Sequence, residues 1–171
     1  MFKRKTSNGN RFATRGQAIV EFAIALPILL ALLIGIFEVG RLIFIYSAVT
    51  NSSRNAVRFA SAVGLSDGGY TKFNYCEGIK DVALKSAYLV PASDLNITIV
   101  YDSGPGTSQI AECNNWNATQ VDTDVVVSSG DRVTVSVSVQ YRPMLRLIPI
   151  GDRTIVSTSS RTILGIINLG N

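Results

Sequence analysis

The sequence contains no histidine and little charge, and these two shortages exclude several classes of protein. Without histidine, the chain has no Ser-His-Asp triad, no Cys-His dyad and few ways to hold zinc. Only 16% of the 171 residues are charged, against about 25% in an average protein. Because 47% of the residues are apolar, this low charge argues against an intrinsically disordered chain. The length fits one domain with an appendage, or one large domain.

An excess of basic residues is found only at the N-terminus. The formal net charge of +4 would first suggest a nucleic acid or an anionic membrane as partner. However, residues 1–16 hold five bases and no acid, whereas residues 17–171 hold eleven bases and twelve acids. The body therefore has no basic excess with which to bind phosphates, and we expect no nucleic-acid partner.

One long apolar run occupies residues 18–37 and reads AIVEFAIALPILLALLIGIF, with Glu21 as its only charge. Twenty helical residues span about 30 Å, the thickness of a hydrocarbon core, so we predict a transmembrane segment at about residues 17–37. The bases before it predict a single pass of the cell (inner) membrane, with a cytoplasmic N-terminus and an extracytoplasmic body. A secretory signal peptide is the competing interpretation, but the run is too long and no Ala-x-Ala ends it.

The helix is predicted to continue past the membrane, over residues 17–63. Residues 42–63 contain neither proline nor glycine, and apolar or small residues recur there at helical spacing. Arg54 and Arg58 form an i, i+4 pair on another face, and Gly64 is suited to cap the C-terminal end. The part beyond the membrane is expected to pack on the domain that follows.

Two residues inside the apolar run break its local rules. Glu21 places a carboxylate in the run, and an acid within a membrane helix is a functional hypothesis by default. Pro27 removes one backbone hydrogen bond and clashes with the preceding turn. The alternatives are an interfacial acid that reaches toward water and a tolerated membrane kink.

The border between the basic leader and the apolar run resembles the processing site of type IV prepilins. It reads Arg15-Gly16-Gln17-Ala18-Ile19-Val20-Glu21-Phe22. The resemblance implies that a membrane-embedded prepilin peptidase removes a leader of residues 1–16 by cutting after Gly16. Gln17 would then be the new N-terminus, and Glu21, followed by Phe22, would be the fifth residue of the mature chain.

A longer stretch, about residues 15–60, resembles the TadE-like pseudopilins of Flp/tight-adherence pilus systems. This stretch is roughly a quarter of the chain, and the body after Gly64 shows no recognisable motif. The shared features are Gly-Gln-Ala, Glu-Phe, the pair Leu26-Pro27, the cluster Gly35, Glu38, Gly40 and Arg41, and the later Arg54 and Arg58.

This resemblance implies a pseudopilin or minor pilin in the assembly or structure of a Flp/Tad pilus, which serves adhesion or secretion. The implied partners are the prepilin peptidase, other pilins or pseudopilins through the N-terminal helix, the inner-membrane assembly platform and the lipid bilayer. The ammonium of Gln17 in one subunit would pair with the Glu21 carboxylate of a neighbour. Such a pair would set the register of the subunits, with Phe22 and Pro27 in the same segment.

Residues 64–171 are predicted to form an extracytoplasmic α+β domain. Clean alternation over residues 131–141 indicates a strand with one buried and one wet face. A long helix packed on a small antiparallel sheet is a pilin-like arrangement. The further expectations are a helix at 77–89, a loop at 102–120, strands at 95–101, 121–128 and 153–165, and a hairpin that turns at 129–131.

Cys76 and Cys113 are the only cysteines, and both follow the apolar run. If that part of the chain lies outside the cytoplasm, the two can form one disulfide, worth roughly 3–4 kcal/mol in the chain-entropy model. The alternative is two unrelated buried thiols.

No residue pattern indicates an active site. The serines have no histidine base, Lys80 and Lys85 lie on a predicted helix face, and Asp122, Asp124 and Asp131 lack EF-hand spacing. We therefore predict no enzyme, no catalytic residue, no metal and no cofactor; the chain would be the substrate of a protease.

Two other functions compete with the pseudopilin. One is a membrane-anchored extracytoplasmic binding domain, which would leave Gly16, Glu21 and the extended helix without a reason. The other is the main filament subunit of a type IV-like pilus. Flp-type major pilins are typically little more than the helix, so the long body favours a low-copy role.

Overall fold

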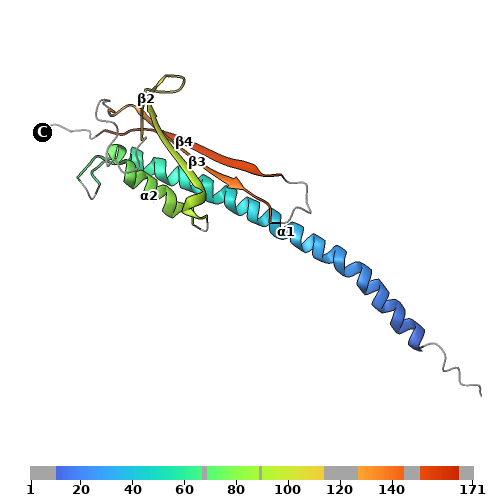
Figure 1. Cartoon of the computed structure of the whole chain (residues 1–171). Coiled ribbons are helices and arrows are strands. Elements are labelled where there is room, and N and C mark those ends of the chain that lie inside the picture. The colour runs from blue at the N-terminus through green and yellow to red at the C-terminus, as the bar shows by residue number, and fades with distance from the viewer. Residues whose placement is uncertain (1–10, 67–68, 89, 114–126, 145–150, 166–171) are drawn as a thin grey trace, which may run out of the picture. The chain divides into compact units, whose positions relative to one another are not determined.

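The structure is a computed structural model that describes residues 11–66, 69–88, 90–113, 127–144 and 151–165 (Figure 1). The chain divides into two compact units, residues 1–41 and 42–171, and the long first helix contributes to both. The elements are α1 (Arg11–Ser61), the 3₁₀ turn η1 (Lys72–Asn74), α2 (Cys76–Ser86), the 3₁₀ turn η2 (Ala92–Asp94), β1 (Leu95–Asp102), β2 (Gln109–Glu112), β3 (Arg132–Tyr141) and β4 (Arg153–Thr162).

In the first unit, α1 presents an apolar surface along its length. Residues 16–61 form the one helix in the described part of the chain that is long and apolar enough to cross a membrane. None of its most apolar window is buried, and Ile19, Phe22 and Ile28 are each more than 60% exposed. A soluble protein rarely leaves so continuous an apolar surface in water, whereas a lipid bilayer satisfies it.

The bounds of α1 differ from the prediction at both ends. In the described residues the helix begins at Arg11, so it continues through Gly16 rather than starting at Gln17. It ends at Ser61, two residues before the predicted end. Gly64 follows with a φ of +115°, a left-handed value that glycine adopts without strain. The helix therefore ends close to the glycine that the sequence suggests.

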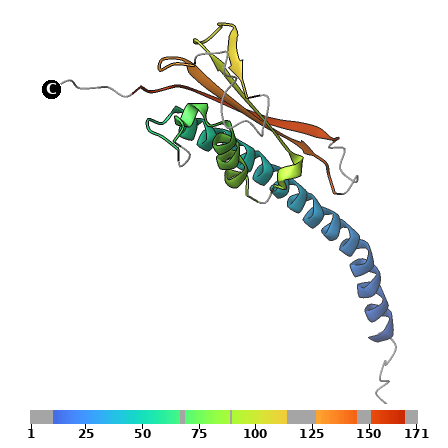
Figure 2. The same cartoon turned by 60° about the vertical axis from the view of Figure 1, so that its left-hand side comes forward.

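The second unit packs residues 42–61 of α1 and the shorter α2 against an antiparallel sheet, which Figure 2 shows lying over α1. The strand order is β2-β1-β3-β4, and all three pairings are antiparallel. Along β1 and β3 the register runs from Leu95 opposite Val139 to Asp102 opposite Arg132. The predicted fold class, a long helix on a small antiparallel sheet, is confirmed.

The core lies between the sheet and the two helices. The predicted alternation in β3 is confirmed, because Val133, Val135, Val137, Val139 and Tyr141 are all buried on one face. The helix supplies mostly small residues to the same core, Val49, Ala56, Val57 and Ala60. Small side chains let the axis of α1 approach the sheet closely, and the β-branched valines fill the space between them.

Two predictions about the sheet are wrong. The expected loop at 102–120 contains β2, which pairs with β1 from Val100 to Asp102. The expected hairpin of 121–128 with β3 does not form, because β1 and β4 already occupy the two edges of β3. Residues 121–126 lie outside the described residues, and Val127 and Ser128 belong to no strand. Alternation indicates that a segment is a strand, but it does not identify the neighbour.

Two other elements are shorter than predicted. The last strand, β4, ends at Thr162 instead of Gly165. Beyond its end, the Ile163 N–H donates to the Asp131 carbonyl at 2.8 Å and the Ile163 carbonyl accepts the Gly130 N–H at 3.0 Å. Ile163 is 2% exposed and joins the core. The helix predicted at 77–89 is α2, Cys76–Ser86, whose last turn closes where the Ala87 N–H donates to the carbonyls of Ala83 and Leu84.

Candidate functional site

The predicted processing residues lie on the exposed part of α1. Gly16 is exposed, and no atom lies within 4 Å of the position that a Cβ would take there. Gln17 and Glu21 are also exposed and lie one helical turn apart. The Gln17 side-chain amide Nε2 donates to Oε1 of Glu21 at 3.2 Å. Gln17, the predicted new N-terminus, and the Glu21 carboxylate are therefore held on one face, about 6 Å apart along the axis.

Phe22 and Pro27 complete this segment. Phe22 is 64% exposed. Pro27 lies inside α1, which continues through it. Because proline has no N–H, the carbonyl four residues earlier, that of Ala23, receives no intrahelical bond from it. The segment thus has one backbone carbonyl without its usual i+4 donor and one carboxylate in an otherwise apolar surface.

The predicted cluster of Glu38, Arg41, Arg54 and Arg58 falls into two parts. Glu38 and Arg41 form an i, i+3 ion pair in the first unit, with Arg41 Nη1 at 3.2 Å from Glu38 Oε1. The Glu38 side chain is 5% exposed, so its charge needs this compensation. Arg54 and Arg58 belong to the second unit and are exposed.

Arg54 and Arg58 line a groove of about 540 Å³ together with Arg161 of β4. The sequence did not single out Arg161, because it is about a hundred residues away and its strand neighbours were not known. The only available signal was the alternation of β4, which places every second side chain of that strand on the face toward α1. The other lining residues are Asn51, Asn55, Val57, Ser159 and Ser160.

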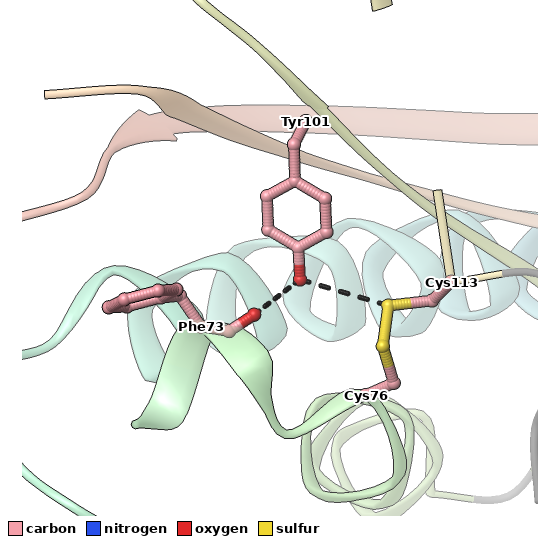
Figure 3. The surroundings of a disulfide bond; sticks show 4 residues. All are labelled: Phe73, Cys76, Tyr101 and Cys113. Carbon is pink, nitrogen blue, oxygen red and sulfur yellow. Dashed lines mark hydrogen bonds between the residues drawn. A yellow bond between two sulfur atoms is a disulfide. The ribbon is translucent and has the colours of Figure 1, made fainter. Parts of the chain in front are cut away.

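The two cysteines form a disulfide, Cys76–Cys113, with their Cα atoms 5.9 Å apart (Figure 3). The bond joins the first residue of α2 to the residue that follows β2, and both cysteines are buried. The alternative of two unrelated thiols is therefore wrong. The bond ties the helical layer to the sheet within the second unit.

Beside the disulfide, the Tyr101 hydroxyl donates to the carbonyl of Phe73 and lies 3.7 Å from Cys113 Sγ (Figure 3). Tyr101 is fully buried, and burial raises the pKa of its hydroxyl well above the ordinary value of 10.0. The phenol therefore stays protonated and acts as a fixed donor, which positions η1 next to the sheet.

Two aspartates at the ends of strands, Asp102 and Asp131, have structural partners. Asp102 receives two hydrogen bonds from Arg132, at 2.8 and 3.0 Å, and caps the Gly104 N–H at 2.9 Å. Asp131 accepts the Ser128 N–H at 2.8 Å. Among the described residues, no group of three or more Cys, Asp or Glu side chains could hold a metal. Asp122 and Asp124 lie outside the described residues.

The comparison with protein families gives one match, the TadE-like protein family, over residues 16–58. Residues 16–58 are a TadE-like segment. The match begins at Gly16, the residue before the predicted cut, and ends at Arg58. The resemblance to TadE-like proteins is thereby confirmed over this segment, and it associates the chain with tight-adherence (Tad) pili. No curated protein and no solved structure matches the chain.

Proposed function

We propose that this protein is a pseudopilin or minor pilin of a Flp/Tad-type pilus, processed after Gly16 by a prepilin peptidase. The observation that carries the proposal is a coincidence of position. The TadE-like match begins at Gly16, and Glu21 follows at the fifth mature position within the exposed, apolar part of α1. A simple membrane tether needs neither a glycine at that border nor an acid in the apolar run.

Three parts of the chain have separate roles in this proposal. Residues 1–16 are a leader that stays in the cytoplasm, because its five bases oppose translocation. Residues 17–37 anchor the chain in the inner membrane and later contact other pilins or pseudopilins. Residues 64–171 form the extracytoplasmic domain, and the Cys76–Cys113 disulfide supports an oxidising compartment for it.

Cleavage changes the electrostatics of the segment. In the uncut chain, the Glu21 carboxylate accepts a hydrogen bond from the Gln17 side chain. The cut creates an ammonium on Gln17, one turn from that carboxylate. Each group is costly when unpaired in apolar surroundings, so an incoming subunit gains most when its Glu21 meets the ammonium of its neighbour. The pair therefore sets the axial register of subunits that the assembly platform brings together.

The proposal is tested by replacing the native gene with a Glu21→Ala variant and counting pili. We expect at least a tenfold loss of piliated cells while the variant still inserts in the membrane, because the unpaired ammonium is left without its partner. Asp94→Ala is the matched control: it removes one exposed acid from the body and should leave piliation unchanged. Normal piliation of the Glu21→Ala strain would overturn the register role, and normal piliation after deletion of the gene would overturn the function.

A further inference from the structure

The groove between α1 and β4, here called the arginine groove, is lined by basic and neutral side chains. Arg54 and Arg58 enter it from α1, and Arg161 enters it from β4. The remaining lining residues are asparagines, serines and Val57, without an acid. The three arginines are exposed, so their guanidinium groups are available to a ligand.

Three like charges facing one opening repel one another unless an anion joins them. The described ion pairs of the chain are those of Arg41, Lys85 and Arg132, so acids compensate bases elsewhere in the described residues. A guanidinium presents a planar fork of donors that matches a carboxylate bidentately. The arginine groove therefore favours a ligand with more than one carboxylate.

The wall that β4 contributes to the arginine groove is wet because the side chains of β4 that line it are polar. Opposite Val133 and Val135 of β3, the strand β4 carries Arg161 and Ser159. Next to the groove, the Ser53 hydroxyl of α1 lies at hydrogen-bond distance, 3.0 Å, from the hydroxyls of both Ser157 and Ser159 of β4. A ligand would thus replace water along this wall rather than enter a dry core.

The same strand forms an open edge of the sheet. Within the described residues, β4 pairs with β3 on one side along Arg153–Thr162, and no strand pairs with its other side. Figures 1 and 2 show this strand in red, alongside α1. Over the ten residues of β4, every second residue directs its N–H and C=O away from β3, and this row of open backbone groups is a template for an added strand.

We propose that the arginine groove and the edge of β4 together bind an acidic, extended segment of a protein partner. The segment adds to β4 by backbone hydrogen bonds, and every second side chain then projects toward α1. Carboxylates at those positions reach Arg54, Arg58 and Arg161. An extended peptide fits better than a small anion, because β4 contributes both to the arginine groove and to the open edge of the sheet. The inference uses the second unit alone, so its failure leaves the proposed function intact.

The test uses the full chain in detergent micelles and a fluorescent peptide in which glutamate alternates with valine. We expect saturable binding by fluorescence anisotropy that weakens as salt rises, since exposed charges are screened. The double variant Arg58→Gln with Arg161→Gln should weaken binding at least tenfold. Arg153→Gln is the control for the single variant Arg161→Gln: it removes one arginine from the same face at the opposite end of β4, beyond the reach of a peptide of about six residues seated at Arg161, and should bind as the wild type.

Two further probes separate the charge from the strand. A peptide with lysine in place of glutamate should not bind. Two peptides carry N-methyl groups on alternate residues, one on the glutamates and the other on the valines. Their affinities should differ at least tenfold, because only one of the two keeps the N–H groups that face β4. Absence of saturable binding, equal loss in Arg153→Gln, or equal binding of both methylated peptides would overturn the proposal. Complete displacement by inorganic phosphate at constant ionic strength would show a small-anion site and overturn it as well.

Discussion

At the residue scale, Tyr101 links three parts of the second unit. Its ring lies in the core on β1, its hydroxyl holds the carbonyl of Phe73 in η1, and Cys113 Sγ lies beside it. A buried tyrosine needs a partner for its hydroxyl, and here the partner is a backbone carbonyl that has no other bond in the described hydrogen-bond pattern. The alternation of residues 95–101 places Tyr101 on the face of Ile97 and Ile99, but the hydrogen bond of its hydroxyl to Phe73 follows only from the fold.

Stability at alkaline pH should depend on Tyr101. Burial raises the pKa of its hydroxyl in the folded chain above the ordinary value of 10.0. The folded state therefore holds this proton after the unfolded state has lost it, so the contribution of Tyr101 is complete below about pH 10 and decreases as the pH rises further. Tyr101→Phe should lower the free energy of unfolding by about 1–2 kcal/mol at neutral pH, through the lost hydrogen bond.

Urea unfolding of the detergent-solubilised chain between about pH 8 and pH 12 measures both effects. The free energies of unfolding of the wild type and Tyr101→Phe should converge above pH 10, because only the wild type carries the Tyr101 hydroxyl, while buried Tyr141 is common to both. A gap between the two that stays constant with pH would contradict the assignment of the alkaline loss to Tyr101.

At the element scale, local periodicity predicted the secondary structure of each segment better than it predicted which segments pack or pair with one another. The valines of β3 alternate with serine and threonine, and that pattern alone predicts a strand with one buried face. The helical spacing of Val49, Ser53 and Ala56 likewise predicted the buried face of α1. The pairing of β3 with β4 depends on the length of the chain between them and on competition for the edge, which no local pattern contains.

The contact between α1 and β4 includes hydrogen bonds that the helical spacing of residues does not predict. Ser53 is fully buried, yet it faces serines of β4 rather than apolar residues. A second hydroxyl, that of Ser52, donates to the carbonyl of Ala83 and joins α1 to α2 at 2.7 Å. Small residues were expected on this face, but hydrogen bonds between the layers follow only from the three-dimensional arrangement.

The disulfide should supply much of the stability of the second unit. It closes a sequence separation of 37 residues, for which the chain-entropy model gives about 4 kcal/mol. The double variant Cys76→Ser with Cys113→Ser should therefore show a lower free energy of unfolding by about that amount. Chemical denaturation with and without reductant measures it: reductant should destabilise the wild type and leave the double variant unchanged. Equal stability of the oxidised wild type and the double variant would contradict this role.

At the scale of the whole molecule, the candidate sites of the two units differ in how far the sequence alone predicts them. The segment around Gly16 and Glu21 was predictable because its signal is local: a basic leader, a glycine, an apolar run and an acid at one fixed spacing. The arginine groove was predictable only in part. Arg54 and Arg58 are one helical turn apart, so their spacing in the sequence predicts that they share a helix face. Arg161 is distant in the sequence, and only the fold brings it close to them.

Beyond the long apolar helix, the chain has a second folded unit. The second unit has its own sheet, core and disulfide, and residues 42–61 of α1 are one of its layers. The chain therefore presents a folded domain on the same helix that carries the proposed assembly signal. The proposed low-copy role and the proposed partner-binding surface both rest on this division.

The most direct test of the account is the mature N-terminus of the protein in its native membrane. Intact mass and N-terminal sequencing should be run in strains with and without an active prepilin peptidase, on the wild type, Gly16→Ala and Gly40→Ala. A Cβ meets no atom within 4 Å at either glycine, so neither alanine disturbs the fold.

The account predicts a chain that begins at Gln17 only when the peptidase is active, in the wild type and in Gly40→Ala but not in Gly16→Ala. A chain that keeps residues 1–16 in the presence of the peptidase, or one cut after about residue 40 as by a signal peptidase, would contradict the assignment to the pilin pathway.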